Sequence, residues 1–72
     1  MHGGDLMNLK CNLKRIREDA RMTQAELSSK ADVNLYMISS YENNRRTPTI
    51  YTLWRLAIAL GCKVDDLYTV ED

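Results

Sequence analysis

The chain has 72 residues, of which 44% are hydrophobic and 28% charged, and its ten Lys and Arg balance ten Asp and Glu. This length allows one domain with a small core, and the composition is that of an ordinary globular protein. Taken alone, a net charge of zero argues against a strongly basic nucleic-acid binder.

The first half of the chain has helical periodicity, and no segment shows the alternation of a strand. Residues 9–21 are predicted as an amphipathic helix because apolar residues recur at intervals of three and four, at Leu9, Leu13, Ile16 and Ala20. The next helix is predicted at residues 24–31, since Thr23 and Glu26 have the spacing of a capping box.

Two further helices follow in the second half. The third is predicted over residues 35–43, after the capping residue Asn34. Pro48 prevents its continuation, so the segment before this proline is a loop. The fourth helix is predicted over residues 50–60 and ends at Gly61.

A short fifth helix at residues 64–68 completes an all-α fold. We predict a five-helix domain over residues 9–68, between an N-terminal tail (1–8) and an acidic C-terminal tail (69–72). Half of the acidic residues lie near the ends, namely Asp5, Asp65, Asp66, Glu71 and Asp72. Residues 6–64 therefore carry ten basic and five acidic side chains, a balance of +5. One face can attract phosphate, unless these charges are evenly mixed and solvated.

The second and third predicted helices have the spacing of a helix-turn-helix, with a turn of three or four residues between them. In such a unit, Leu27 and Ile38 meet beneath the turn. Val33 fills the turn, and the small Ser28 lies where the helices cross. The second helix of the unit can then enter the major groove of DNA. A generic helical hairpin has similar spacing, so the spacing alone does not decide.

Five segments carry a more specific pattern: Leu-Lys-Arg-Ile-Arg-Glu (13–18), Met-Thr-Gln-Ala-Glu-Leu (22–27), Ile-Ser-Ser-Tyr-Glu-Asn (38–43), Arg-Arg-Thr-Pro-Thr (45–49) and Leu-Ala-Ile-Ala-Leu-Gly (56–61). With these segments the sequence resembles the Cro and phage-repressor class of helix-turn-helix proteins, the XRE family, from about Leu13 to Tyr68. The resemblance implies a compact five-helix, lambda-repressor-like DNA-binding domain that works as a dimer. Asp32 and Asn44 stand where this family usually has glycine, and Lys63 where a Ser or Asp cap is common.

The resemblance also implies which residues contact DNA. Gln24 would bond a phosphate at the start of its helix, unless it is merely solvated. Four residues would face base edges: Leu35, Tyr36, Ser39 and Ser40. Three would bind backbone phosphates: Asn43, Arg45 and Arg46.

Two of these residues are unusual for a DNA contact. Leu35 and Tyr36 suit the methyl groups of thymine, or the Tyr36 hydroxyl bonds a base or a phosphate. The alternative is that both side chains cover core or pack on a partner.

Arg17 and Glu42 resemble the buried ion pair of the family. Such a pair would tie the first helix to the end of the third and orient the third helix. Removing one partner would leave a buried charge and cost several kcal/mol.

The core face of the fourth helix consists of Ile50, Leu53, Leu56, Ala57 and Leu60. The helix also has a second apolar stripe. Tyr51, Trp54 and Ile58 lie roughly 130° away from that face. An exposed apolar stripe predicts a two-fold homodimer interface, together with residues after Val64. The alternative is that Leu6 and Met7 of the N-terminal tail fold over it.

No apolar run approaches the about 20 residues that cross a membrane, and the first residues lack the features of a signal peptide. We expect a cytoplasmic protein without membrane contact. Cys11 and Cys62 are far apart, and the one histidine is His2. We therefore predict free thiols, no metal and no cofactor.

These observations predict a sequence-specific transcriptional regulator, a repressor that binds a pseudo-palindromic operator on double-stranded DNA as a homodimer. A phage or mobile-element repressor and a restriction-modification controller are both compatible contexts. The alternative is an antitoxin-type module that binds a toxin protein and also binds DNA, with the acidic residues from Asp65 as the partner surface. One histidine and scattered acids assemble no catalytic site, so we expect no enzyme.

Overall fold

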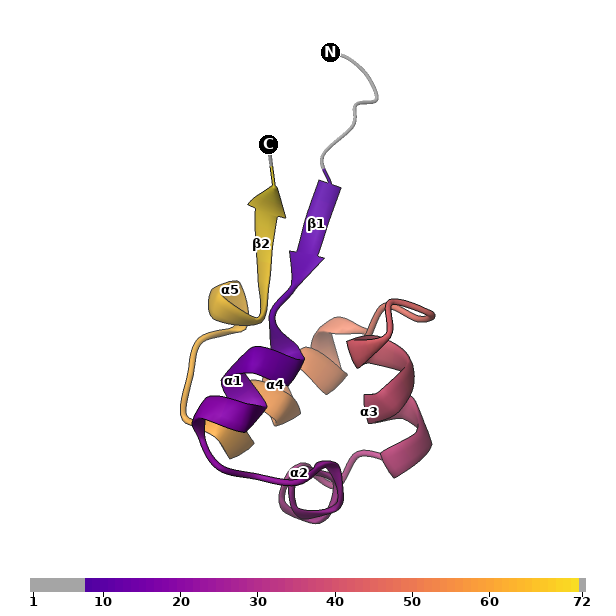
Figure 1. Cartoon of the computed structure of the whole chain (residues 1–72), viewed down its shortest axis with the longest axis vertical. Helices are drawn as coiled ribbons and strands as arrows, with labels where there is room; N and C mark the ends of the chain where they lie inside the picture. Colours follow the sequence, from indigo (N-terminus) through magenta and orange to yellow (C-terminus); the bar gives the residue numbers. More distant parts are fainter. Residues whose placement is uncertain (1–7, 72) are drawn as a thin grey trace.

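The computed structural model describes residues 8–71. As predicted, the body consists of five helices, which are α1 (Leu13–Asp19), α2 (Gln24–Ala31), α3 (Leu35–Glu42), α4 (Ile50–Leu60) and α5 (Val64–Leu67). Two strands, β1 (Asn8–Cys11) and β2 (Tyr68–Glu71), pair antiparallel and extend away from the body (Figure 1).

The prediction that no strand forms is wrong. Residues 9–11, expected at the start of the first helix, and residue 8 of the expected N-terminal tail belong to β1. Residue 68, expected at the end of the fifth helix, and residues 69–71 of the expected acidic tail belong to β2. The register pairs Leu9 with Val70 and Cys11 with Tyr68. Each strand has only four residues, which is too short for a clear alternation to stand out in the sequence. Residues 1–7 and residue 72 of the predicted tails lie outside the described residues.

Asn12, between β1 and α1, forms hydrogen bonds to residues of α5 and β2 at the other end of the chain. Its backbone N–H donates to the Leu67 carbonyl at 2.8 Å. Its side-chain Nδ2 donates to the Asp66 carbonyl and to Thr69 Oγ1, both at 3.1 Å. The side chain is buried, so these bonds compensate for its lost hydration. No local pattern in the sequence predicts this role of Asn12.

The core is built from one fully buried side chain of each helix: Leu13, Leu27, Ile38, Leu56 and Leu67. Burial of each contributes about 1.5–3 kcal/mol to folding. The predicted meeting of Leu27 and Ile38 in the core is confirmed, and Val33 is buried with them. The core therefore includes the contact that sets α2 against α3.

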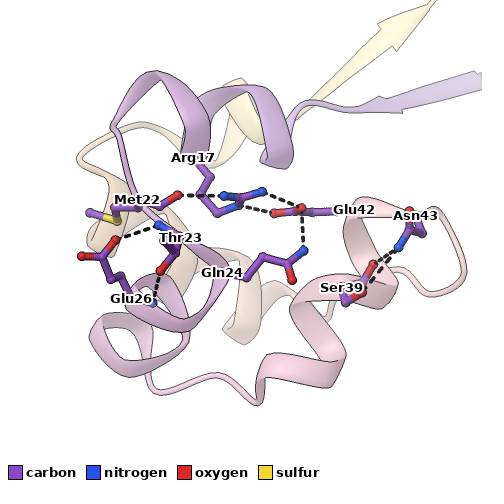
Figure 2. Close-up of polar contacts among 8 residues, drawn as sticks. All are labelled: Arg17, Met22, Thr23, Gln24, Glu26, Ser39, Glu42 and Asn43. Carbon is purple, nitrogen blue, oxygen red and sulfur yellow. Dashed lines mark hydrogen bonds and ion pairs between the residues drawn. The ribbon is translucent and has the colours of Figure 1, made fainter.

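The helix ends follow from local chemistry. Thr23 and Glu26 form the predicted capping box, with Thr23 Oγ1 accepting from Glu26 N at 3.0 Å and Glu26 Oε1 accepting from Thr23 N at 2.8 Å (Figure 2). Asn34 Oδ1 caps α3 by accepting the N–H groups of Tyr36 and Met37, at 2.8 and 3.3 Å.

The last helix starts without a capping side chain at Lys63, in keeping with its departure from the family pattern. Instead, the carboxylate of Asp66 accepts from the Lys63 backbone N–H at 3.0 Å. This bond satisfies one donor at the start of α5 from inside the helix.

Candidate nucleic-acid interface

The turn between α2 and α3 is closed by two hydrogen bonds between the same residues. Val33 N donates to the Ser28 carbonyl at 3.1 Å, and Ser28 Oγ donates to the Val33 carbonyl at 2.6 Å. Asp32 adopts the left-handed conformation, φ 56°, at the position where the family pattern has glycine. Aspartate tolerates this backbone better than most residues, so the turn keeps its shape without glycine.

The ion pair predicted between Arg17 and Glu42 is present and joins α1 to α3. Arg17 Nε donates to Glu42 Oε2 at 2.7 Å and Nη2 donates to Oε1 at 3.1 Å (Figure 2). The third guanidinium nitrogen, Nη1, donates to the Met22 carbonyl at 2.7 Å. The two side chains are only 10% and 3% exposed. The hydrogen bond to Glu42 raises the pKa of Arg17 further above its ordinary value, so the guanidinium stays charged.

Gln24 joins this pair from the start of α2. Its Nε2 donates to Glu42 Oε1 at 2.9 Å, so the carboxylate accepts from two side chains on two other helices (Figure 2). This contact was not anticipated, because its partners lie 18 residues apart. It restrains Gln24 at the position that the family pattern assigns to a phosphate contact.

The first turn of α3 presents apolar side chains to solvent. Leu35 is 45% exposed and Tyr36 is 66% exposed. Ser39 is half-buried, and exposed Asn43 donates from Nδ2 to the Ser39 carbonyl at 2.9 Å and to Ser39 Oγ at 3.4 Å (Figure 2).

The prediction that Ser40 faces the bases is wrong. Ser40 is buried, and its hydroxyl donates to the Tyr36 carbonyl at 3.0 Å. A serine inside a helix can bond the carbonyl one turn earlier, which turns its short side chain back onto the helix. The Ser40 carbonyl is also occupied, by the N–H of Arg45.

The loop after α3 carries two exposed arginines, Arg45 and Arg46. Its start is held against the helix, since Arg45 N donates to the Ser40 carbonyl at 2.8 Å and Asn44 adopts φ 60°. Residues 35–48 contain one acid, Glu42, which is paired with Arg17. The loop therefore adds uncompensated positive charge at the end of α3.

A second apolar surface lies on α4. Tyr51, Trp54 and Ile58, here called the α4 stripe, are 80%, 56% and 74% exposed. The prediction that Ile50 lies on the core face is wrong, because Ile50 is the first residue of α4 and is 57% exposed. Leu6 and Met7, the alternative cover for this stripe, lie outside the described residues.

Other kinds of site find no support within residues 8–71. No pocket is present, and no three His, Cys, Asp or Glu side chains group as metal ligands. No helix in this range is long and apolar enough to cross a membrane. Cys11 and Cys62 are free thiols, and burial raises the pKa of Cys62. The candidate site is thus an exposed surface centred on α3.

Comparison with known sequences gives three matches. Residues 13–67 match the family HTH_3, described as helix-turn-helix. The chain is 38% identical over 61 residues to an uncharacterized HTH-type transcriptional regulator, y4dJ, of Sinorhizobium fredii, which covers 85% of this chain and 79% of that protein. It is 33% identical over 59 residues to the immunity repressor protein of Bacillus phage phi105, which covers 82% of this chain and 41% of the repressor.

The solved structures that are similar in fold include two with sequence identities of 30% and 33%. A chain of the SinR protein/SinI protein complex superimposes with a TM-score of 0.74 at 30% identity, over 78% of this chain and 55% of that one. The restriction-modification controller protein C.Esp1396I gives a TM-score of 0.67 at 33% identity, over 71% of this chain and 67% of that one. The chain thus spans little more than half of the first structure and about two fifths of the phage repressor.

Proposed function

The chain belongs to the HTH_3 (XRE-type) family of helix-turn-helix transcriptional regulators, and we propose that it represses transcription by binding a pseudo-palindromic DNA operator as a homodimer. One observation carries this proposal. The helix α3 is held by the buried Arg17–Glu42 pair and by the connection to α2, whereas the side chains at its start and the following arginine loop are exposed. Because a regulator acts where its DNA lies, the proposal includes a cytoplasmic location. The proposal includes no enzymatic activity.

Base contacts come from α3 in this proposal. Leu35, Tyr36 and Ser39 enter the major groove, which is wide enough for one helix. The buried Arg17–Glu42 pair fixes the orientation of α3, since a shift of the helix would change which base each side chain reaches.

Phosphate contacts surround α3. Gln24 uses one amide N–H on Glu42, and an amide nitrogen carries two, so the second can donate to a phosphate. Arg45 and Arg46 bind the backbone at the other end of the helix. The zero net charge of the whole chain means that non-specific attraction to DNA is modest.

Dimerisation supplies the remaining affinity. The α4 stripe is the interface, and two copies related by a two-fold axis place their α3 helices in successive major grooves about 34 Å apart. The operator then has two half-sites of similar sequence. Bound there, the dimer blocks access of the polymerase to the promoter.

The test is selection of double-stranded DNA from a random pool by the purified chain, at about 50 mM and about 200 mM salt. We expect one enriched motif with two-fold symmetry, bound more weakly at the higher salt. Failure to enrich a motif at either concentration would overturn the proposal.

The α4 stripe also favours a second candidate function, an antitoxin-type module whose partner is a different protein. One similar structure is the complex of two proteins, SinR and SinI. Sedimentation of the chain alone separates the two candidates. A dimer supports the repressor, whereas a monomer that still selects a DNA motif supports a module completed by another protein.

A further inference from the structure

The helix α3, which we propose enters the major groove, lacks the side chains that usually read bases. Arg and Lys read guanine, and Asn and Gln read adenine, each through two hydrogen bonds. None of these four residue types occurs among the eight residues of α3, Leu-Tyr-Met-Ile-Ser-Ser-Tyr-Glu. The single charged residue, Glu42, is occupied by Arg17 and Gln24.

The amides that flank α3 are occupied as well. Asn34 Oδ1 accepts two backbone N–H groups at the start of the helix, so it cannot also accept from adenine in a two-bond pair. Asn43 Nδ2 is bonded to Ser39 at the other end. Paired hydrogen bonds to a base are therefore not available from these residues.

Leu35 and Tyr36 are the large side chains that remain exposed on α3, and both are mainly apolar. The one apolar group on the base edges of the major groove is the C5-methyl of thymine. The exposed Arg45 and Arg46 of the adjoining loop place positive charge beside this surface, which favours a polyanion over an apolar protein face as its partner.

We propose that Leu35 and Tyr36 are the specificity-determining residues and that they read C5-methyl groups of pyrimidines. This inference rests on the proposed DNA-binding function and specifies its ligand. The operator half-site is then defined by the positions of thymine methyls. A 5-methylcytosine carries the same methyl group in the same place, so it substitutes in part for thymine at those positions.

The expected size of the effect follows from the burial of one methyl group. Removing it should weaken binding about fourfold, the equivalent of about 0.8 kcal/mol. Removing the same methyl from both half-sites of a symmetric operator should weaken binding about sixteenfold, because the two losses add as free energies.

The experiment starts from the motif that the full chain selects. Each thymine is replaced in turn by deoxyuracil, which removes only the methyl group, and affinities are compared with that of the unmodified DNA. We expect a loss of about fourfold at one or more positions in each half-site. Deoxyuracil outside the motif is the control. At the same positions, 5-methylcytosine should bind about fourfold better than cytosine.

Variants of the chain then assign the contact. In Leu35→Ala or Tyr36→Ala, the penalty for deoxyuracil should disappear at the position that the lost side chain covers. Tyr36→Phe should keep the penalty, because it loses only the hydroxyl. Both residues are exposed, so circular dichroism should show an unchanged fold.

Three results would overturn the inference while leaving the proposed function intact. One is a selected motif whose binding is indifferent to deoxyuracil throughout. Another is a penalty that both alanine variants retain. The third is Tyr36→Phe altering the selected bases as much as Tyr36→Ala, which would assign the reading to the hydroxyl. If no motif is selected at all, the proposed function fails and the inference fails with it.

Discussion

Two helices of this small domain expose large apolar side chains, and they differ in what surrounds those side chains. On α3, Leu35 and Tyr36 are followed by a loop with two exposed arginines. The single charged residue of α4 is Arg55, and its Nη1 donates to the Asp32 carbonyl at 3.3 Å. Exposed apolar residues alone therefore do not identify a partner. The neighbouring charge points to a nucleic acid for α3 and to an apolar protein face for α4.

The two surfaces also differ in their support. The end of α3 is held by the buried Arg17–Glu42 pair and by Gln24. α4 is held by apolar burial, through Leu56, Ala57 and Ala59. Hydrogen bonds have direction, whereas apolar burial does not, so the pair adds a buried directional restraint at the end of α3. This suits a surface that must match base positions.

The largest expected effect comes from breaking the support of α3. Glu42→Gln keeps the size of the side chain but leaves the guanidinium of Arg17 buried without a counter-charge. We expect a loss of about 3 kcal/mol in the free energy of unfolding, measured by urea denaturation. This is a large share of the stability of a domain of this size.

Asp19→Asn is the matched control for that variant. It breaks the Arg15–Asp19 pair, whose side chains are 65% and 71% exposed and 3.7 Å apart. Such a pair contributes little, so the change in stability should stay within about 0.5 kcal/mol. Equal losses in the two variants would mean that burial of the Arg17–Glu42 pair has no special importance.

The next largest effect tests the partner of α4. Trp54→Glu places a carboxylate in the centre of the α4 stripe, and desolvating that charge should weaken dimerisation by about a hundredfold or more. Sedimentation equilibrium measures the change, and circular dichroism checks the fold. Ser29→Glu adds the same charge at an exposed position of α2 and should leave the dimer intact. A Trp54→Glu protein that still dimerises would place the interface elsewhere.

A smaller effect tests the charge beside α3. Arg45→Ala should weaken binding to all DNA sequences alike and reduce the slope of log affinity against log salt by about one. Arg15→Ala removes an exposed arginine from α1 and serves as the control, with an unchanged slope expected. If Arg45→Ala instead changed which sequences are selected, the loop would read bases and the contrast with α4 would need another explanation.

Much of this comparison follows from the sequence, where the signals are local. The capping box at Thr23, the cap at Asn34 and the apolar spacing of α4 set the helix bounds, and the α4 stripe is visible in the same spacing. The Arg17–Glu42 pair came from resemblance to a family rather than from any local pattern. Contacts between distant residues were missed, as with the bond of Gln24 to Glu42 and the bonds of Asn12 across the ends of the body.

Two errors have physical causes that spacing alone does not reveal. Leu9 continues the apolar spacing of α1, yet it lies in β1 because Val70 is available as its cross-strand partner. Ser40 was placed among the base-reading residues, but a short hydroxyl side chain can satisfy itself on its own helix. In the first case the deciding partner is distant in the sequence, and in the second it is the carbonyl one helical turn earlier.

The smallest expected effect comes from removing the residues that cap the N-termini of α3 and α4. Asn34 Oδ1 accepts two N–H groups on α3, and Thr49 Oγ1 accepts one, from Thr52 at 3.3 Å, on α4. Asn34→Ala should cost about 1 kcal/mol in urea denaturation and Thr49→Ala about 0.5 kcal/mol. Because the first turn of α3 carries Leu35 and Tyr36, Asn34→Ala should also weaken binding to the selected DNA, measured under conditions in which both variants are folded. Thr49→Ala should leave that affinity nearly unchanged, and equal losses of affinity would show that order in the first turn of α3 does not control base contact.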